Sequence, residues 1–127
     1  MTEKLLLLAA AGAVGTLARY GLILWVQDVS KSAFPWGTVV VNVLGCFLFG
    51  LVWGLADVEG RMRLTAGTRA VILTGFMGAF TTFSTYIFET EQLLKDTQWW
   101  MAAGNVAVQN VVGLVLMVLG IALGRML

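Results

Sequence analysis

The sequence of 127 residues contains no histidine and a single cysteine, Cys46, which lies within an apolar run. Disulfide frameworks, Cys/His zinc sites and histidine-dependent catalytic triads are therefore excluded within one chain. Because the residues that most enzymes use for such chemistry are missing, we predict that the protein is not an enzyme.

Charged residues are also scarce, at 12% of the chain, whereas a soluble domain carries about 25%. The net charge is only +1, and no clustered basic face suggests a nucleic-acid partner. Hydrophobic residues make up 59% of the chain, and the mean hydropathy is +0.88. This composition predicts an integral membrane protein that forms one transmembrane domain over residues 1–127.

Four apolar runs are long enough to cross a bilayer, since a membrane-spanning helix needs about 20 residues. The predicted spans cover residues 5–26, 36–56, 69–94 and 99–123. The first run lacks the cleavage site of a signal peptide, so we interpret it as a retained span. The predicted fold class is all-α, with four transmembrane helices in each subunit.

An even number of spans places both termini on one side of the membrane. That side carries five basic residues, Lys4, Arg61, Arg63, Arg69 and Arg125, whereas the other side carries Lys31 and Lys95. Lysine and arginine are enriched in cytoplasmic loops, so this small excess weakly favours termini inside the cell.

Small residues recur at the spacing that lets membrane helices approach closely. Gly50 and Gly54 form a GxxxG pair, as do Gly120 and Gly124, and residues 11 and 15 form a weaker version. The alternative is that these glycines are scattered without a packing role. Four spans of this size cannot comfortably enclose a pore, so we expect an oligomer.

The third run contains an unusual stretch, residues 75–86, in which two glycines precede four closely spaced threonine and serine residues. Each glycine disfavours a helix by about 1 kcal/mol relative to alanine, and the hydroxyl groups compete for backbone partners. One interpretation is a broken helix whose freed carbonyl groups face something polar, since irregular backbone at membrane depth must be buried in protein or line a cavity. The other is a continuous helix with small residues for close packing.

Several polar residues lie within the predicted spans. Arg19 either extends its charge to the interface or lines a vestibule that attracts anions. Asn42 either offers its amide N–H donors to an anion or joins helices by hydrogen bonds. Asn105, Gln109 and Asn110 form a polar patch in the fourth run, for which hydrogen bonding between helices is again the alternative.

Aromatic residues follow the unusual stretch at helical spacing. Phe83 and Tyr86 are three residues apart, and so are Phe80 and Phe83. The edge of an aromatic ring is the positive end of its quadrupole, so these rings either replace water around a small anion or form ordinary core.

Acidic residues are absent from the middle of every predicted span. Glu89 and Glu91 fall near the end of the third run, where we expect both to be solvated. Proton-coupled exporters need a titrating carboxylate within the membrane, so this pattern disfavours a small proton-coupled multidrug exporter.

Four motifs together resemble the Fluc family of fluoride channels, and the resemblance covers essentially the whole chain. Residues 12–20 resemble G-x-x-G-x-x-x-R-[YW], and residues 37–47 resemble G-T-x-x-x-N-x-x-G-x-F. Residues 75–86 resemble the long and specific G-F-x-G-x-x-T-T-F-S-T-F, and Asn105 with residues 110–113 is similar to N-x-x-x-x-N-x-x-G.

The resemblance implies four-helix subunits that pair with inverted (antiparallel) topology into a homodimer in the inner membrane of a bacterial cell. Each dimer of that family holds two pathways for passive export of fluoride from the cytoplasm. The resemblance also implies a structural sodium ion at the dimer centre, held by backbone carbonyls of Gly78 and Thr81 from both subunits.

The same resemblance implies which residues line the fluoride pathway. The predicted set consists of Arg19, Asn42, Thr82, Phe83, Ser84, Tyr86 and Asn110. Tyr86 stands where family members usually have phenylalanine, and its hydroxyl adds a donor. Besides the exporter, a membrane assembly subunit without transport activity is the alternative function.

Overall fold

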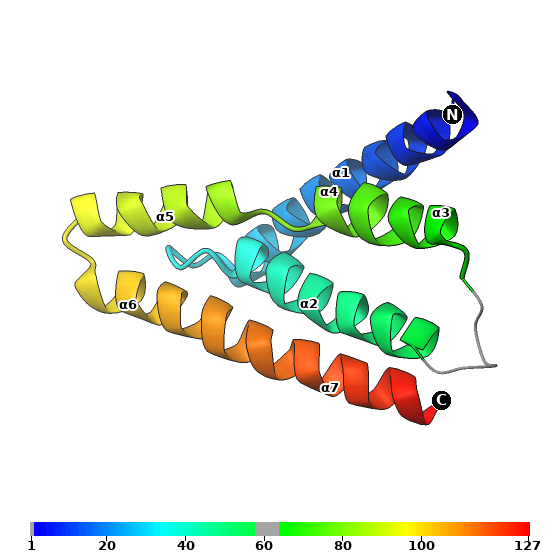
Figure 1. Ribbon diagram of the computed structural model, residues 1–127. Coiled ribbons are helices and arrows are strands. Elements are labelled where there is room, and N and C mark those ends of the chain that lie inside the picture. Colours follow the sequence, from blue (N-terminus) through cyan, green and yellow to red (C-terminus); the bar gives the residue numbers. More distant parts are fainter. Residues whose placement is uncertain (1, 58–63) are drawn as a thin grey trace.

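The computed structural model describes residues 2–57 and 64–127, which form helices joined by short connections (Figure 1). The first two helices are α1 (Thr2–Ser30) and α2 (Trp36–Asp57). The third run forms α3 (Ala66–Arg69), the π-helical η1 (Ala70–Met77), α4 (Gly78–Phe80) and α5 (Phe83–Lys95). The fourth forms α6 (Trp99–Ala107), the π-helical η2 (Val108–Val112) and α7 (Gly113–Met126).

Four helical segments are long and apolar enough to cross a membrane, which confirms the predicted all-α membrane fold. They run over Thr2–Ser30, Trp36–Asp57, Ala66–Lys95 and Trp99–Met126. Helices extend past several predicted ends because backbone hydrogen bonding continues beyond the apolar residues that defined the spans. Two of the basic residues counted above, Arg61 and Arg63, lie outside the described residues.

Helices α2 and α7 lie side by side along much of their length (Figure 1), and their glycines form the seam. A Cβ atom at Gly50 would lie 2.3 Å from the carbonyl oxygen of Met117, and one at Gly120 would lie 2.3 Å from that of Phe47. Such contacts are possible only without a side chain. The predicted role of the GxxxG pairs in close packing is therefore confirmed.

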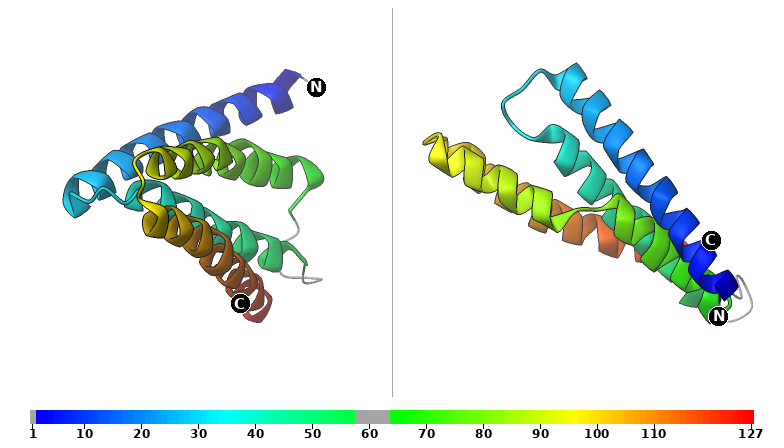
Figure 2. Two further views of the ribbon diagram at one scale, coloured as in Figure 1. Left: turned by 90° about the vertical axis from the view of Figure 1, so that its left-hand side faces the viewer. Right: turned by 90° about the horizontal axis from the view of Figure 1, so that it is seen from above.

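Helix α1 contacts the third segment through a similar approach at Gly15, where a Cβ atom would lie 2.4 Å from the Phe76 carbonyl oxygen. Gly15 is the buried residue of α1, so most of the apolar surface of this helix faces outward. At the end away from both termini, the α1–α2 hairpin diverges from the α5–α6 hairpin (Figure 2).

The third segment is interrupted between α4 and α5, where Figure 1 shows an uncoiled link. Thr81 has φ −85° and ψ 160°, and Thr82 has φ −149° and ψ 114°, so both residues are extended. Of the two interpretations of residues 75–86, the backbone angles match the broken helix. The interruption is two residues long and follows the glycines, which themselves remain helical.

Candidate functional site

Asn42 of α2 lies opposite the interruption and pairs with the backbone of Thr82. The Thr82 N–H donates to Asn42 Oδ1 at 2.7 Å, and Asn42 Nδ2 donates to the Thr82 carbonyl at 2.9 Å. The side-chain amide thus acts as a peptide group would in a neighbouring strand. In hydrocarbon each unpaired backbone group costs several kcal/mol, so this pairing stabilises the extended residue.

A chain of amide hydrogen bonds continues from Asn42 into the fourth segment. Asn42 Nδ2 donates to Gln109 Oε1 at 2.6 Å, and Gln109 Nε2 donates to Asn105 Oδ1 at 3.0 Å. Asn105 Nδ2 then donates to the hydroxyl of Thr90 at 2.9 Å, which donates to the Tyr86 carbonyl at 2.8 Å. Asn105 is fully buried, and Gln109 is nearly so. This polar relay joins α2, α5, α6 and η2.

Both Nδ2 protons of Asn42 are therefore directed to protein acceptors. In this structure Asn42 joins helices, which was the alternative to its role as an anion donor. An anion can use an Asn42 proton only by replacing Gln109 Oε1 or the Thr82 carbonyl.

The other half of the interruption is held by Arg19 of α1. Arg19 Nη1 donates to the Thr81 carbonyl at 3.2 Å, and the Thr81 hydroxyl donates to the Met77 carbonyl at 3.1 Å. The structure thus brings Arg19 from the first helix to the interruption, where its charge faces a carbonyl oxygen.

Gly78 loses its usual partner at the interruption. In a continuous helix the Thr82 N–H would donate to the Gly78 carbonyl, but here that N–H bonds Asn42. Gly78 and Thr81 both line a cavity of about 130 Å³ whose other walls are mostly apolar, formed by Gly45, Cys46, Phe49, Leu73, Met77 and Met117.

Phe83 and Tyr86 contact each other edge to face, with ring centroids 5.5 Å apart and an interplanar angle of 62°. They differ in exposure, since Phe83 is 73% exposed and Tyr86 only 6%. The Tyr86 hydroxyl accepts a bond from Asn110 Nδ2 at 3.0 Å, and that nitrogen also donates to the Val106 carbonyl.

Thr82 and Ser84 act at the start of α5. The Thr82 hydroxyl accepts a bond from the Thr85 N–H at 3.3 Å, so Thr82 is the N-cap of this helix. The Ser84 hydroxyl lies 3.4 Å from that of Thr82, and Ser84 is exposed.

A cavity of about 220 Å³ collects most of the predicted pathway residues. Its walls are formed by Asn42, Cys46, Thr81, Thr82, Phe83, Tyr86, Gln109 and Asn110. Of the predicted set, Arg19 and Ser84 do not line it. The cavity is therefore lined by amide side chains, hydroxyl-bearing residues and two aromatic rings, residue types that suit a small anion with little water around it.

Comparison with known proteins places the chain in a family. Residues 6–121 match the family model described as "CrcB-like protein, Camphor Resistance (CrcB)". The chain belongs to the CrcB-like protein family.

Curated CrcB-like relatives named "Fluoride-specific ion channel FluC" align with the full length of the chain. The relative from Solidesulfovibrio magneticus is 56% identical and that from Nitrosococcus oceani 51% identical, each over 127 residues and 100% of both chains. A more distant one, from Parabacteroides distasonis, is 38% identical over 96% of this chain and 93% of its own. The relatives are named as channels and not as enzymes, and the chain is a multi-pass bacterial membrane protein.

The prediction for Glu89 is wrong in this CrcB-like chain. Its side chain is half-buried, and Oε1 accepts a bond from the buried Thr38 hydroxyl at 2.7 Å. Its position near the end of the apolar run suggested solvation, but α5 lies close enough to α2 for Glu89 to bond Thr38. Glu91 is exposed as predicted, and it pairs with Lys95 at 2.7 Å.

Gln109 is the main residue of this cavity that sequence reasoning did not assign to the pathway, since Asn110 was chosen in the fourth run. The i,i+4 spacing of Asn105 and Gln109 was the available signal, because it places both amides on one face of the helix. Asn110 is offset from that face, yet it also lines the cavity and donates a bond to the Tyr86 hydroxyl.

Proposed function

We propose that this chain forms a fluoride-selective ion channel that lowers cytoplasmic fluoride by passive export across the bacterial inner membrane. The observation that carries the proposal is the cavity between α2, α5 and the fourth segment, where amide side chains and two aromatic rings converge. The names of the full-length relatives agree with this chemistry.

The mechanism of anion binding follows from the hydrogen bonds around the cavity. Fluoride is a strong acceptor, so it takes the place of Gln109 Oε1 on Asn42 Nδ2, while Phe83 and Tyr86 turn ring edges toward it. The displaced Gln109 remains bonded to Asn105. The bond from Asn42 partly replaces the water that fluoride loses. Because Gln109 Oε1 competes for the same proton, the ion is not held too tightly to leave.

The functional unit in this proposal is an inverted homodimer with two pathways. Phe83 is 73% exposed beside the cavity, and α1 has a largely uncovered apolar surface, so both features suit contact with a second copy. Reaction of a tagged terminus with a membrane-impermeant reagent tests the topology, and labelling from both sides of the membrane is expected. Labelling from one side alone would contradict the inverted arrangement.

A structural sodium ion at the dimer centre is part of the proposal. The Gly78 carbonyl fits such an ion because it has lost its helical donor, and Thr81, whose carbonyl accepts a bond from Arg19, lines the same cavity. A carbonyl oxygen has two lone pairs, so Thr81 can serve both cations. Two oxygens are too few to replace the hydration of a cation, so a second copy must supply the others.

Efflux from liposomes that contain the purified protein tests the main proposal. Vesicles loaded with fluoride should lose it rapidly when a potassium ionophore balances charge, whereas vesicles loaded with chloride should retain it. Equal rates for the two anions, or rates equal to those of protein-free vesicles, would reject the proposal.

Glu89 is half-buried against α2, but it lies near the end of the Ala66–Lys95 span, so the absence of an acidic residue in the middle of the spans still disfavours a proton-coupled exporter. The two functions differ in their energy source, so the efflux experiment distinguishes them when it is done without a pH gradient. A passive channel needs only the fluoride gradient. Transport of an organic cation that depends on a pH gradient, with no fluoride efflux, would favour the exporter.

A further inference from the structure

The hydroxyl of Tyr86 is a polar group of the fluoride cavity that the mechanism above leaves unused. Tyr86 is 6% exposed and lines the cavity of about 220 Å³, at the position where Fluc channels usually have phenylalanine. Among the described residues its hydroxyl makes one hydrogen bond, with Asn110 Nδ2 at 3.0 Å. A phenol can both accept and donate, so the role of its hydrogen depends on the direction of this bond.

The direction of that bond is fixed by the amide of Asn110. Its Nδ2 lies 2.8 Å from the Val106 carbonyl oxygen, which can only accept, so the amide atom that faces both groups is the nitrogen. An amide nitrogen only donates, so the Tyr86 oxygen is the acceptor. The phenolic hydrogen therefore points away from Asn110, and it stays near the ring plane because the oxygen is conjugated with the ring.

That hydrogen has no acceptor in the part of the chain that the structure describes. The other hydroxyls that line the cavity are already used. Thr81 donates to the Met77 carbonyl at 3.1 Å, and the Thr82 hydroxyl donates to that of Thr85 at 2.9 Å. A buried donor without a partner is costly, and Tyr86 is too buried for its hydrogen to reach the outer surface. The cavity is the space that remains for an acceptor.

The π-helical turn η2 carries the two amides that hold this wall of the cavity. A π-helical turn contains more residues than an α-helical turn, so it changes which side chains share a face. Gln109 and Asn110 are neighbours in sequence, yet both line the cavity. Gln109 bonds Asn42, whereas Asn110 bonds Tyr86. Each of the two donors that face the cavity is thus oriented by its own amide.

We propose that the Tyr86 hydroxyl donates a hydrogen bond to fluoride in this cavity, and that Asn110 is the residue that positions it. The inference rests on the proposed function, since it assigns a further donor to the same site. A small anion gains more from an O–H donor than from a ring edge, because hydrogen bonds to ionised groups are about twice as strong as neutral ones. A larger halide accepts such a bond less well, so the hydroxyl also favours fluoride over chloride.

Fluoride efflux from liposomes, measured over a range of fluoride concentrations, tests the donor. Tyr86→Phe removes only the hydroxyl, and it should raise the half-saturating fluoride concentration about tenfold, the effect of one hydrogen bond to a charged group. Discrimination against chloride should fall as well. Tyr20→Phe is the matched control, because Tyr20 is exposed on α1 and does not line the cavity. It should leave the half-saturating concentration unchanged.

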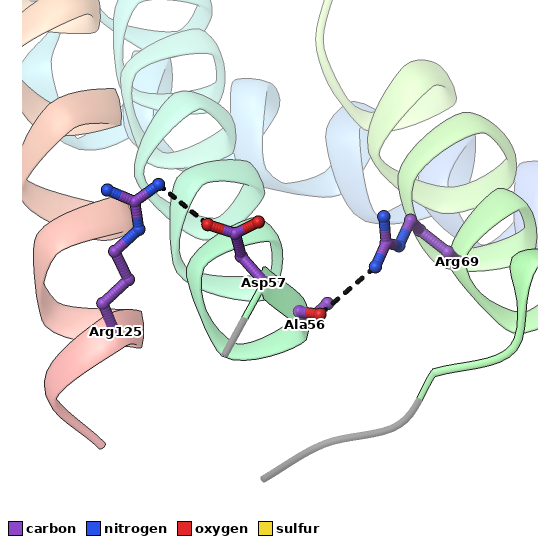
Figure 3. A network of polar contacts seen from close by, with 4 residues as sticks. All are labelled: Ala56, Asp57, Arg69 and Arg125. Atoms are coloured by element: carbon purple, nitrogen blue, oxygen red, sulfur yellow. Dashed lines mark hydrogen bonds and ion pairs between the residues drawn. The ribbon is translucent and has the colours of Figure 1, made fainter. Parts of the chain in front are cut away.

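A double-mutant cycle tests the role of Asn110. Asn110→Leu lets the phenolic hydrogen turn, so it should raise the half-saturating concentration in the wild type and have no further effect in Tyr86→Phe. A merely structural role would give the same effect in both backgrounds. Arg125→Gln is the control for a lost contact of the fourth segment. It removes the ion pair with Asp57 at 2.8 Å (Figure 3), which lies apart from the cavity, and should leave the half-saturating concentration unchanged.

Infrared difference spectroscopy of the reconstituted protein observes the hydroxyl directly. The C–O stretching band of a phenol shifts when its hydrogen gains an acceptor, and isotopic labelling of the tyrosine rings identifies the band. Addition of fluoride should shift one tyrosine band in the wild type and in Tyr20→Phe, but none in Tyr86→Phe.

The outcomes distinguish this inference from the proposed function. Absence of fluoride efflux in the wild type would reject the function and the inference together. Fluoride efflux with an unchanged half-saturating concentration in Tyr86→Phe, or without a shift of the Tyr86 band, would overturn the inference alone. A Tyr86 band that shows a donating hydroxyl before fluoride is added, as when a second copy of the chain supplies the acceptor, would overturn it as well.

Discussion

At the scale of single residues, Asn42 has the largest structural role in the site. Its amide makes three hydrogen bonds, two to the extended Thr82 backbone and one to Gln109. No other residue type of this size offers two donors and an acceptor in one plane. Aspartate would lose both donors, and leucine would leave all three partners unpaired. The same residue therefore holds the interruption together and supplies the donor that the proposed fluoride site needs.

We predict that Asn42→Ala reduces fluoride efflux by more than tenfold without preventing dimer formation. Each lost bond is worth about 1 kcal/mol, so the protein should also become less stable by a few kcal/mol. Thr65→Ala is a suitable control, since it removes the N-cap of α3 far from the cavity at a cost of about 1 kcal/mol. Wild-type efflux by Asn42→Ala would remove this residue from the pathway.

Phe83→Ile should also abolish most fluoride efflux, but for a different reason. The substitution keeps an apolar side chain and removes the ring edge, and little stability is lost because Phe83 is 73% exposed in one subunit. Phe88→Ile is the matched control, because Phe88 is an exposed ring of the same helix that does not line the cavity. If both variants conduct equally, the Phe83 ring has no special role.

At the scale of helices, the seam between α2 and α7 is a close contact that is sensitive to added volume. We predict that Gly50→Ala destabilises the protein by about 1–3 kcal/mol, since the new methyl group meets the Met117 carbonyl. Gly21→Ala offers the opposite result, because nothing lies within 4 Å of the new Cβ. It should stabilise α1 by up to about 1 kcal/mol.

Thermal unfolding in detergent, followed by circular dichroism, measures both glycine variants. A lower midpoint for Gly50→Ala and an equal or higher midpoint for Gly21→Ala are expected. Similar midpoints for the two variants would mean that the seam relaxes by moving the helices apart.

The helices themselves could be predicted because each follows from local sequence. Apolar runs of membrane length, GxxxG spacing and the glycine and hydroxyl residues of positions 75–86 all act within one segment. The location of the interruption could not be predicted as precisely. It depends on the pairing of Thr82 with Asn42, a contact across 40 residues that no local pattern encodes.

At the scale of the molecule, tertiary contacts decided the residues that were misjudged. Glu89 was expected in solvent, yet Thr38 of α2 bonds it. Gln109 was passed over for Asn110, yet Gln109 is the amide that meets Asn42. Arg19 was open between two roles, and its bond to the Thr81 carbonyl adds a contact that the sequence did not indicate. Each outcome depends on which helix faces which, and that arrangement is set by packing.

The proposed dimer predicts a slow response to removal of sodium. The Gly78 and Thr81 carbonyls lie at the interruption, so an ion enclosed by two copies would have to leave a closed site. Prolonged exchange of sodium for a bulky organic cation should therefore inactivate fluoride efflux gradually, and returning sodium should restore it. Full efflux after complete exchange would contradict a structural role for the ion.

The chemical composition of the polar relay has a consequence for the proton gradient across a bacterial membrane. From Asn42 to Thr90 the relay consists of amides and one hydroxyl, and none of these groups gains or loses a proton near neutral pH. Because the relay contains no titrating group, it offers protons no path across the membrane. A channel of this kind can stay in an energised membrane without discharging it, and proteoliposomes in fluoride-free buffer should hold an imposed pH gradient.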